Sequence, residues 1–331
     1  MTRQLHARDT GTDLDPTTMT TAAFLDHWLA TAIRPHKRQG TYERYQQAAR
    51  SHIAPHIGAI PLRKLNALHL SGMYAALREQ GLSTNTVALD HTVLHAALKQ
   101  AVAWQLVPSN AADAVSRPRG QTKEFPLWDI ETASRFEAAL REEEFGLIFV
   151  IKLRTGLRRG ELLGLRWEHV HLDQDFLTVA ESRVKVSGGT KVEAPKGGRS
   201  RRIDLSEEET GLLEAHAERQ ARQREEAGAG WRDGGHVFTM SDGRPITPST
   251  FGRRWQALLM KTGVPAIRPH DLRHLNVSIL LEGGHNVKVV QGRAGHHSAA
   301  FTLDRYGHVM EGGRRRAAGA VGDALKRARK P

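Results

Sequence analysis

Hydrophobic residues recur at helical spacing through the first third of the chain. In residues 20–33, Phe24, Leu25, Trp28 and Leu29 form one apolar stripe, which is typical of an amphipathic helix. Three more helices are predicted at residues 41–58, 66–81 and 83–107. The connecting loops are short, so this part of the chain is expected to form a four-helix domain.

Polar residues and helix breakers mark the ends of these segments. The second helix is expected to open at Thr41, a plausible N-terminal cap, and the third to run from Asn66 to Gly81. The fourth begins at Ser83 and stops before Pro108.

Two segments interrupt or precede the helical pattern. Residues 1–19 are polar and without periodicity, and we interpret them as a disordered lead-in. Residues 117–126 combine proline, glycine and basic side chains and indicate an exposed linker. The helical domain therefore spans residues 20–116.

The pattern changes again within the second domain, which is expected to span residues 127–310. Helices are predicted at 129–144 and 145–156, whereas 175–205 holds short β-rich runs separated by glycine turns, as in a small antiparallel sheet. Helices return from Glu207, and residues 311–331 form an Arg/Ala-rich tail that can add one more helix. The predicted fold is mainly α with a small antiparallel sheet.

Composition narrows the class of protein. The chain has 331 residues, of which 39% are hydrophobic, and no apolar run approaches the roughly 20 residues of a membrane-spanning helix. The N-terminus lacks the apolar region of a signal peptide, so we expect a cytoplasmic protein. The absence of cysteine excludes disulfides, thiolate metal sites and cysteine nucleophiles.

Charge points to a polyanionic partner. The formal net charge is +12, and both parts of the chain contribute: residues 1–120 carry 13 Lys/Arg against 8 Asp/Glu, and the remainder carries 35 against 28. Two basic domains favour nucleic acid as the partner, although some basic proteins have no such role.

The stretch "TGLRRGELLGLRW" offers the first candidate site. Gly156 is expected to end one helix and Arg158 to lie at the start of the next, beside unpaired backbone N–H groups that attract anions. Glu161, one turn further on, can hold this arginine in place. Alternatively, Arg158 and Arg159 are solvated surface charges.

Two further candidates follow along the chain. In "RPHDLRH", His270 and Arg273 are three residues apart and share a helix face. Alternatively, His270 only forms a hydrogen bond at the start of the helix. In "APKGGRSRR", Lys196 lies at a glycine-rich hairpin tip, where most lysines are only solvated.

The stretch "AGHHSAAFTLDRYGHV" holds the last candidates. Tyr306 follows His296 by ten residues, and His296 follows Arg273 by 23. Tyr306 is either a half-buried helix aromatic or a nucleophile.

Taken in order, these four stretches resemble the motifs of the tyrosine recombinases, or phage-type integrases. The resemblance covers residues 20–310 and implies an N-terminal helical core-binding domain before the catalytic domain. It also implies a site-specific DNA recombinase that cuts and rejoins DNA through a 3′-phosphotyrosine, without metal, nucleotide or other cofactor, to integrate or excise a phage or mobile element.

Carried over residue by residue, the resemblance implies that Arg158 and Arg273 bind the scissile phosphate and that Tyr306 is the nucleophile. His296 takes the histidine/tryptophan position of the family. His270 takes the first position of its HxxR motif, Lys196 is the general acid, and Glu161 supports Arg158.

The implied partners are double-stranded DNA attachment sites, with a homotetramer assembled on two duplexes and an accessory directionality factor as a further candidate. We expect the protein to be nucleoid-associated. Two alternatives stay open, a type IB topoisomerase-like enzyme and a non-catalytic DNA-binding relative.

Overall fold

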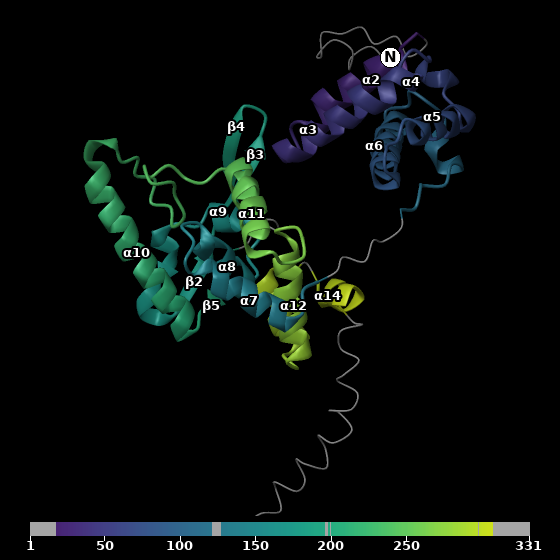
Figure 1. Cartoon of the computed structure of the whole chain (residues 1–331). Coiled ribbons are helices and arrows are strands. Elements are labelled where there is room, and N and C mark those ends of the chain that lie inside the picture. Colours follow the sequence, from purple (N-terminus) through teal and green to yellow (C-terminus); the bar gives the residue numbers. More distant parts are fainter. Residues whose placement is uncertain (1–17, 121–126, 196–197, 199, 297, 307–331) are drawn as a thin grey trace, which may run out of the picture. The chain divides into compact units, whose positions relative to one another are not determined.

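The computed structural model describes residues 18–120, 127–195, 198, 200–296 and 298–306 (Figure 1). The chain divides into two compact units, Met1–Lys123 and Glu124–Pro331. Most of the expected lead-in, part of the expected linker and all of the C-terminal tail lie outside the described residues. No helix among the described residues is long and apolar enough to cross a membrane.

The first unit contains the four predicted helices. They are α2 (Thr21–Trp28), continued by a π-helical turn at Leu29–Ile33; α3 (Gln39–Gln47), continued by a π-helical turn at Ala48–Ile53 and by α4 (Ala54–Ile57); α5 (Ala67–Glu79); and α6 (Thr84–Ala103). Short 3₁₀ turns occupy Leu62–Lys64 and Ala111–Ala114.

The ends of two helices differ from prediction. α3 begins at Gln39 rather than Thr41, because the Thr41 amide already donates to the Arg38 carbonyl within the first turn. α6 ends at Ala103, where Gln105 adopts a left-handed φ of 60° and the Leu106 amide turns back to the Ala101 carbonyl.

The second unit contains eight α-helices and five strands within the described residues. The helices are α7 (Ile130–Leu140), α8 (Gly146–Thr155), α9 (Arg159–Leu163), α10 (Glu207–Ala227), α11 (Pro248–Thr262), α12 (Asp271–Glu282), α13 (Val287–Ala294) and α14 (Ala299–Tyr306). Short 3₁₀ turns occupy Trp167–His169, Leu172–Gln174 and Gly228–Gly230. The strands are β1 (Val170–His171), β2 (Phe176–Val179), β3 (Ser182–Val186), β4 (Gly189–Glu193) and β5 (Arg201–Asp204).

The predicted single sheet is two sheets. β1, β2 and β5 form an antiparallel sheet in that order, whereas β3 and β4 form a separate hairpin, whose turn stands away from the rest of the unit (Figure 1). The difference follows from burial: Leu177 and Val179 of β2 alternate into the core, but the hairpin strands have no buried residue.

α8 runs through the main core of the second unit. Phe149 lies 5.1 Å from Trp255 and 4.7 Å from Phe251 between ring centroids, and Ile151 is fully buried. Buried on nearly all sides, α8 is a rigid base for the turn that follows it.

A smaller core holds the C-terminal helices together. It consists of Val277, Leu281, Val290, Ala294 and Tyr306, contributed by α12, α13 and α14. This packing places the only tyrosine of the second unit's described residues against the helix that carries Arg273.

Candidate active site

The turn between α8 and α9 presents Arg158. Gly156 ends α8 with a left-handed φ of +67°, and a Cβ atom there would lie 2.7 Å from the Asn276 side-chain oxygen. Only glycine fits this turn without strain. Arg158 then occupies the N-cap of α9 with its side chain 24% exposed.

Glu161 ties this arginine to the helix. Its carboxylate accepts from the Arg158 amide at 2.9 Å and from Arg158 Nη1 at 2.8 Å. Burial alone would raise the pKa of Glu161, but hydrogen bonds from Arg201 and the charges of Arg201 and Arg158 outweigh it and hold the pKa at about 2. Glu161 is therefore ionised at neutral pH.

Arg201 was not among the predicted site residues. From the start of β5 it donates to both Glu161 oxygens, at 2.9 and 2.6 Å, and to the Arg293 carbonyl at 3.0 Å. It lies 40 residues from Glu161 in the sequence, and no motif spacing indicates that pairing.

Arg273 is almost fully buried, 2% exposed, on the first turn of α12. Its guanidinium donates to the Gly156 carbonyl at 2.7 Å and to the Ala294 carbonyl. Burial, followed by the charge of Arg158, lowers the pKa of Arg273 to about 9, so the side chain stays charged at neutral pH.

The two predicted arginines meet at one turn. Arg158 Nη2 donates to the Gly295 carbonyl at 2.6 Å, next to the Ala294 carbonyl that Arg273 contacts. His296 comes directly after. Arg158, 137 residues from Gly295 in the sequence, and Arg273, 21 residues from Ala294, thus both donate to this turn. Two guanidiniums beside one turn are suited to binding an anion.

Tyr306 lies at the same centre. Its ring stacks on His296, with centroids 6.2 Å apart and planes 10° apart, and the side chain is 2% exposed. His296 Nδ1 lies 2.9 Å from the Thr302 hydroxyl, which fixes the imidazole on the turn before α14.

His274 is a second residue that sequence reasoning missed. Its Nδ1 contacts the Tyr306 hydroxyl, and its ring lies edge-on to that of His270 with centroids 5.0 Å apart. The signal was present, since His274 directly follows Arg273 in "PHDLRH".

His270 is the N-cap residue of α12, but its side chain makes no capping hydrogen bond to the helix. The residue as a whole is exposed, yet desolvation of its ring, followed by the charges of Lys152 and His274, lowers the pKa of His270 below its usual range. The imidazole is therefore neutral at pH 7.

The remaining predicted residue, Lys196, lies outside the described residues. A different lysine, Lys152 of α8, is fully buried beneath the arginines.

Among the described residues, no group of three or more His, Asp or Glu is arranged to hold a metal ion.

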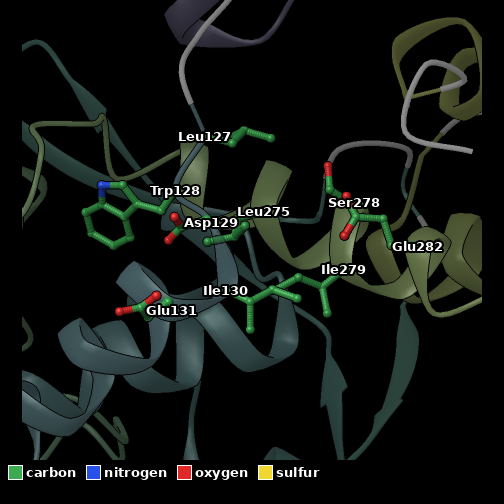
Figure 2. A pocket seen from close by; sticks show the side chains of 9 residues that line it. All are labelled: Leu127, Trp128, Asp129, Ile130, Glu131, Leu275, Ser278, Ile279 and Glu282. Carbon is green, nitrogen blue, oxygen red and sulfur yellow. The ribbon is translucent and has the colours of Figure 1, made fainter. Parts of the chain in front are cut away.

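A separate pocket of about 490 Å³ opens between the start of α7 and α12 (Figure 2). Figure 2 shows Ile130 and Ile279 side by side there, with Glu131 and Glu282 at the two ends. The predicted site residues that the structure describes lie elsewhere.

Comparison with known proteins decides the family. Residues 132–312, more than half of the chain, match the phage integrase family, and residues 20–77 match its N-terminal SAM-like domain. An integrase of Streptomyces ambofaciens is 30% identical over 317 residues, which cover 91% of this chain and 79% of that protein. The chain belongs to the phage integrase family.

Other relatives agree with this assignment. The ICEBs1 integrase of Bacillus subtilis is 26% identical over 287 residues, covering 86% of this chain and 78% of that protein. The chain is thus a tyrosine-type site-specific DNA recombinase, as the sequence motifs predict, and the family favours this activity over the topoisomerase and non-catalytic alternatives.

Solved structures share the fold. The Tn1549 transposon integrase, in complex with a circular intermediate DNA, superposes with a TM-score of 0.78 at 20% identity over 92% of this chain and 99% of that one. A lambda integrase tetramer bound to a Holliday junction superposes with a TM-score of 0.66 at 18% identity over 90% and 82%. The predicted architecture of a helical first domain and an α+β catalytic domain is confirmed.

Proposed function

We propose that this integrase cuts and rejoins DNA with Tyr306 as its nucleophile. The observation that carries the proposal is the convergence of Arg158, Arg273, His296 and Tyr306 on the turn 294–296. A phosphodiester in that place would face two permanent positive charges and the phenol oxygen together.

The cleavage step makes one bond and breaks another. The Tyr306 oxygen attacks the phosphorus, the bond to the 5′-oxygen breaks, and that oxygen leaves with a proton as a 5′-hydroxyl. The strand remains attached to Tyr306 through its 3′-phosphate. A 5′-hydroxyl from a second strand reverses the step, so the bond energy is kept without a nucleotide.

The charged residues act on the phosphate. Negative charge grows on its nonbridging oxygens during attack, and Arg158 and Arg273 are placed to stabilise it together with His296. Each such preorganised donor contributes about 3 kcal/mol, or roughly a hundredfold in rate. Glu161 keeps Arg158 in place, as its two hydrogen bonds support.

Proton transfer falls to other residues. His274 contacts the phenol oxygen and is placed to take its proton, with neutral His270 beside it. Lys196 is proposed to deliver the proton to the leaving 5′-oxygen, because a lysine near other cations has a lowered pKa.

DNA is the partner, and the likeness to DNA-bound integrases supports it. We further propose that a homotetramer holds attachment sites on two duplexes; the tetramer of lambda integrase bound to a Holliday junction supports this assembly. An accessory directionality factor and a nucleoid-associated location are part of this proposal. The domain bounds 20–116 and 127–310 with a linker at 117–126 belong to the same proposal.

The test is covalent trapping on a nicked duplex that carries the junction of the mobile element. Wild-type protein should form a covalent adduct at the 3′-phosphate, whereas Tyr306→Phe should bind the DNA equally and form none, because the ring is kept and only one oxygen is lost.

Tyr45→Phe is the matched control, because Tyr45 stacks on Trp28 in the first unit. This variant should cleave DNA normally. Adduct formation by Tyr306→Phe would show that the nucleophile is a different residue.

A further inference from the structure

Lys152 is a buried charge that the cleavage mechanism does not use. It is 0% exposed and lies among the apolar residues of α8. A buried ammonium is costly unless it is well paired, and replacing it by an apolar side chain of similar size often stabilises a protein. A lysine at this position therefore calls for a reason other than stability.

Its contact is with the turn that presents Arg158. Lys152 Nζ donates to the Leu157 carbonyl at 2.6 Å. The preceding carbonyl, that of Gly156, accepts from Arg273. Two cations thus hold two consecutive peptide groups directly before Arg158, so the direction of its guanidinium depends on both.

The surroundings of Lys152 are mostly positive. Three guanidiniums face it, those of Arg273 in α12 and of Arg158 and Arg159 at the start of α9, against one carboxylate, Glu161. The neutral imidazole of His270, at the N-cap of α12, is also nearby. Burial, followed by the charge of Arg273, lowers the pKa of Lys152 to about 7. Its charge therefore changes within the ordinary working range of pH.

We infer that Lys152 is a positioning residue of the recombinase: its ammonium fixes the Leu157 carbonyl and thereby the turn from which Arg158 reaches the scissile phosphate. The inference rests on the proposed function. Because Lys152 is buried, it acts through Arg158 rather than by touching DNA, and a small displacement of a catalytic group is enough to slow chemistry by up to about a hundredfold.

The experiment measures single-turnover cleavage of the nicked substrate, DNA affinity and urea unfolding at pH 6.5 and 8.5. Lys152→Met should cleave about ten- to a hundredfold more slowly at pH 6.5, with DNA affinity unchanged within about twofold. The deficit should shrink at pH 8.5, where wild-type Lys152 has itself lost its charge.

Stability should move in the opposite direction. A lysine whose pKa is lowered on folding destabilises the protein fully below its folded pKa, and the penalty fades as pH rises from 7 towards the unfolded value. Lys152→Met should thus gain most in unfolding midpoint, relative to wild type, at pH 6.5. Ile151→Val, one residue away in the same core, should lose stability slightly and cleave normally.

Lys152→Arg keeps a permanent charge and a donor, and should restore cleavage at both pH values. If Lys152→Met does not fold, the inference is tested by the cleavage rates of the wild type and of Lys152→Arg. The ratio of these two rates must change between pH 6.5 and 8.5, because only the wild type loses the charge at this position. A constant ratio, or wild-type cleavage by Lys152→Met, overturns the inference. Absence of any adduct with wild-type protein would instead overturn the proposed function.

Discussion

At the scale of single residues, the site is a group of cations balanced by one buried carboxylate. Glu161 accepts from Arg158 and Arg201, and its side chain is 1% exposed. Removing one partner of such a network leaves uncompensated charge in the interior. Glu161 should therefore matter for stability as well as for the orientation of Arg158.

Glu161→Gln tests this balance. The folded-state pKa of Glu161 is depressed from 4.5 to about 2, so its stabilising effect is present above pH 4.5 and is lost as pH falls through 2. We expect Glu161→Gln to lower the free energy of unfolding by about 3 kcal/mol at pH 7, because that is the free energy to which this pKa shift corresponds. Urea unfolding at pH 7 and pH 2.5 measures it, and the loss should be much smaller at the lower pH.

Glu168→Gln is the matched control, because Glu168 pairs with Arg166 at the surface, 59% exposed. Its effect should stay within about 0.5 kcal/mol. An equal loss from both substitutions would contradict the role given to Glu161.

The sequence predicts those site residues that lie within recognisable motifs. Arg158, Arg273, His296 and Tyr306 are placed at one centre by the fold, although their catalytic roles stay predictions. Arg201 could not be found, because its partner depends on how β5 docks beside α9. Lys152 gave a weak signal, a lysine inside the apolar run "LIFVIKL", which helical periodicity alone could not interpret.

At the scale of elements, the site depends on the close approach of α9 to the β3–β4 hairpin. A Cβ atom on Gly160 would lie 2.4 Å from Ser182 Oγ and 3.1 Å from the Arg183 carbonyl. Glycine at this position lets the short helix that begins with Arg159 lie directly on β3.

Gly160→Ala should separate these two elements. We expect a loss of about 1–3 kcal/mol in the free energy of unfolding from overpacking, and slower cleavage, since Arg158 is the N-cap of the same helix. Thermal unfolding and single-turnover cleavage measure the two effects.

Gly211→Ala in α10 is the control, because nothing lies within 4 Å of its added methyl group. It should gain up to about 1 kcal/mol from helix propensity. If Gly160→Ala is equally well tolerated, the close approach of α9 to β3 is not a constraint.

Periodicity predicts the helices better than the sheets. The apolar stripe of residues 20–33 is confirmed, and the helices expected to begin at Asn66 and Ser83 do so, with these residues as their N-caps. The one predicted cap, Thr41, is wrong. The division of the strands into two sheets was missed, because local β-propensity does not say which strand pairs with which. The pairing of β2 with β5 across the intervening hairpin depends on tertiary contacts.

At the scale of the whole molecule, the proposal requires copies of the chain to assemble on two duplexes. The tail at residues 311–331 lies outside the described residues. Its sequence carries Arg314, Arg315 and Arg316 and places Val321 and Leu325 four apart, so it is predicted to need a partner surface to fold as a helix. We propose that it docks on a neighbouring copy.

Deleting residues 312–331 should then spare binding to one site and weaken synapsis of two sites. Native gels of one-site and two-site complexes measure both. A variant in which the tail arginines and lysines are replaced by glutamine controls for simple phosphate attraction. Wild-type synapsis and recombination by the truncated protein would leave the tail with no role beyond its charge.

The central claim is that Tyr306 carries the cleaved strand, and peptide mapping of the covalent adduct tests it most directly. Trypsin cleavage after Arg305 and Arg314 releases the peptide of residues 306–314, whose only tyrosine is Tyr306. We predict that mass spectrometry finds the nucleotide on this tyrosine, joined through a 3′-phosphate. Attachment to another residue, or through a 5′-phosphate, would contradict the account.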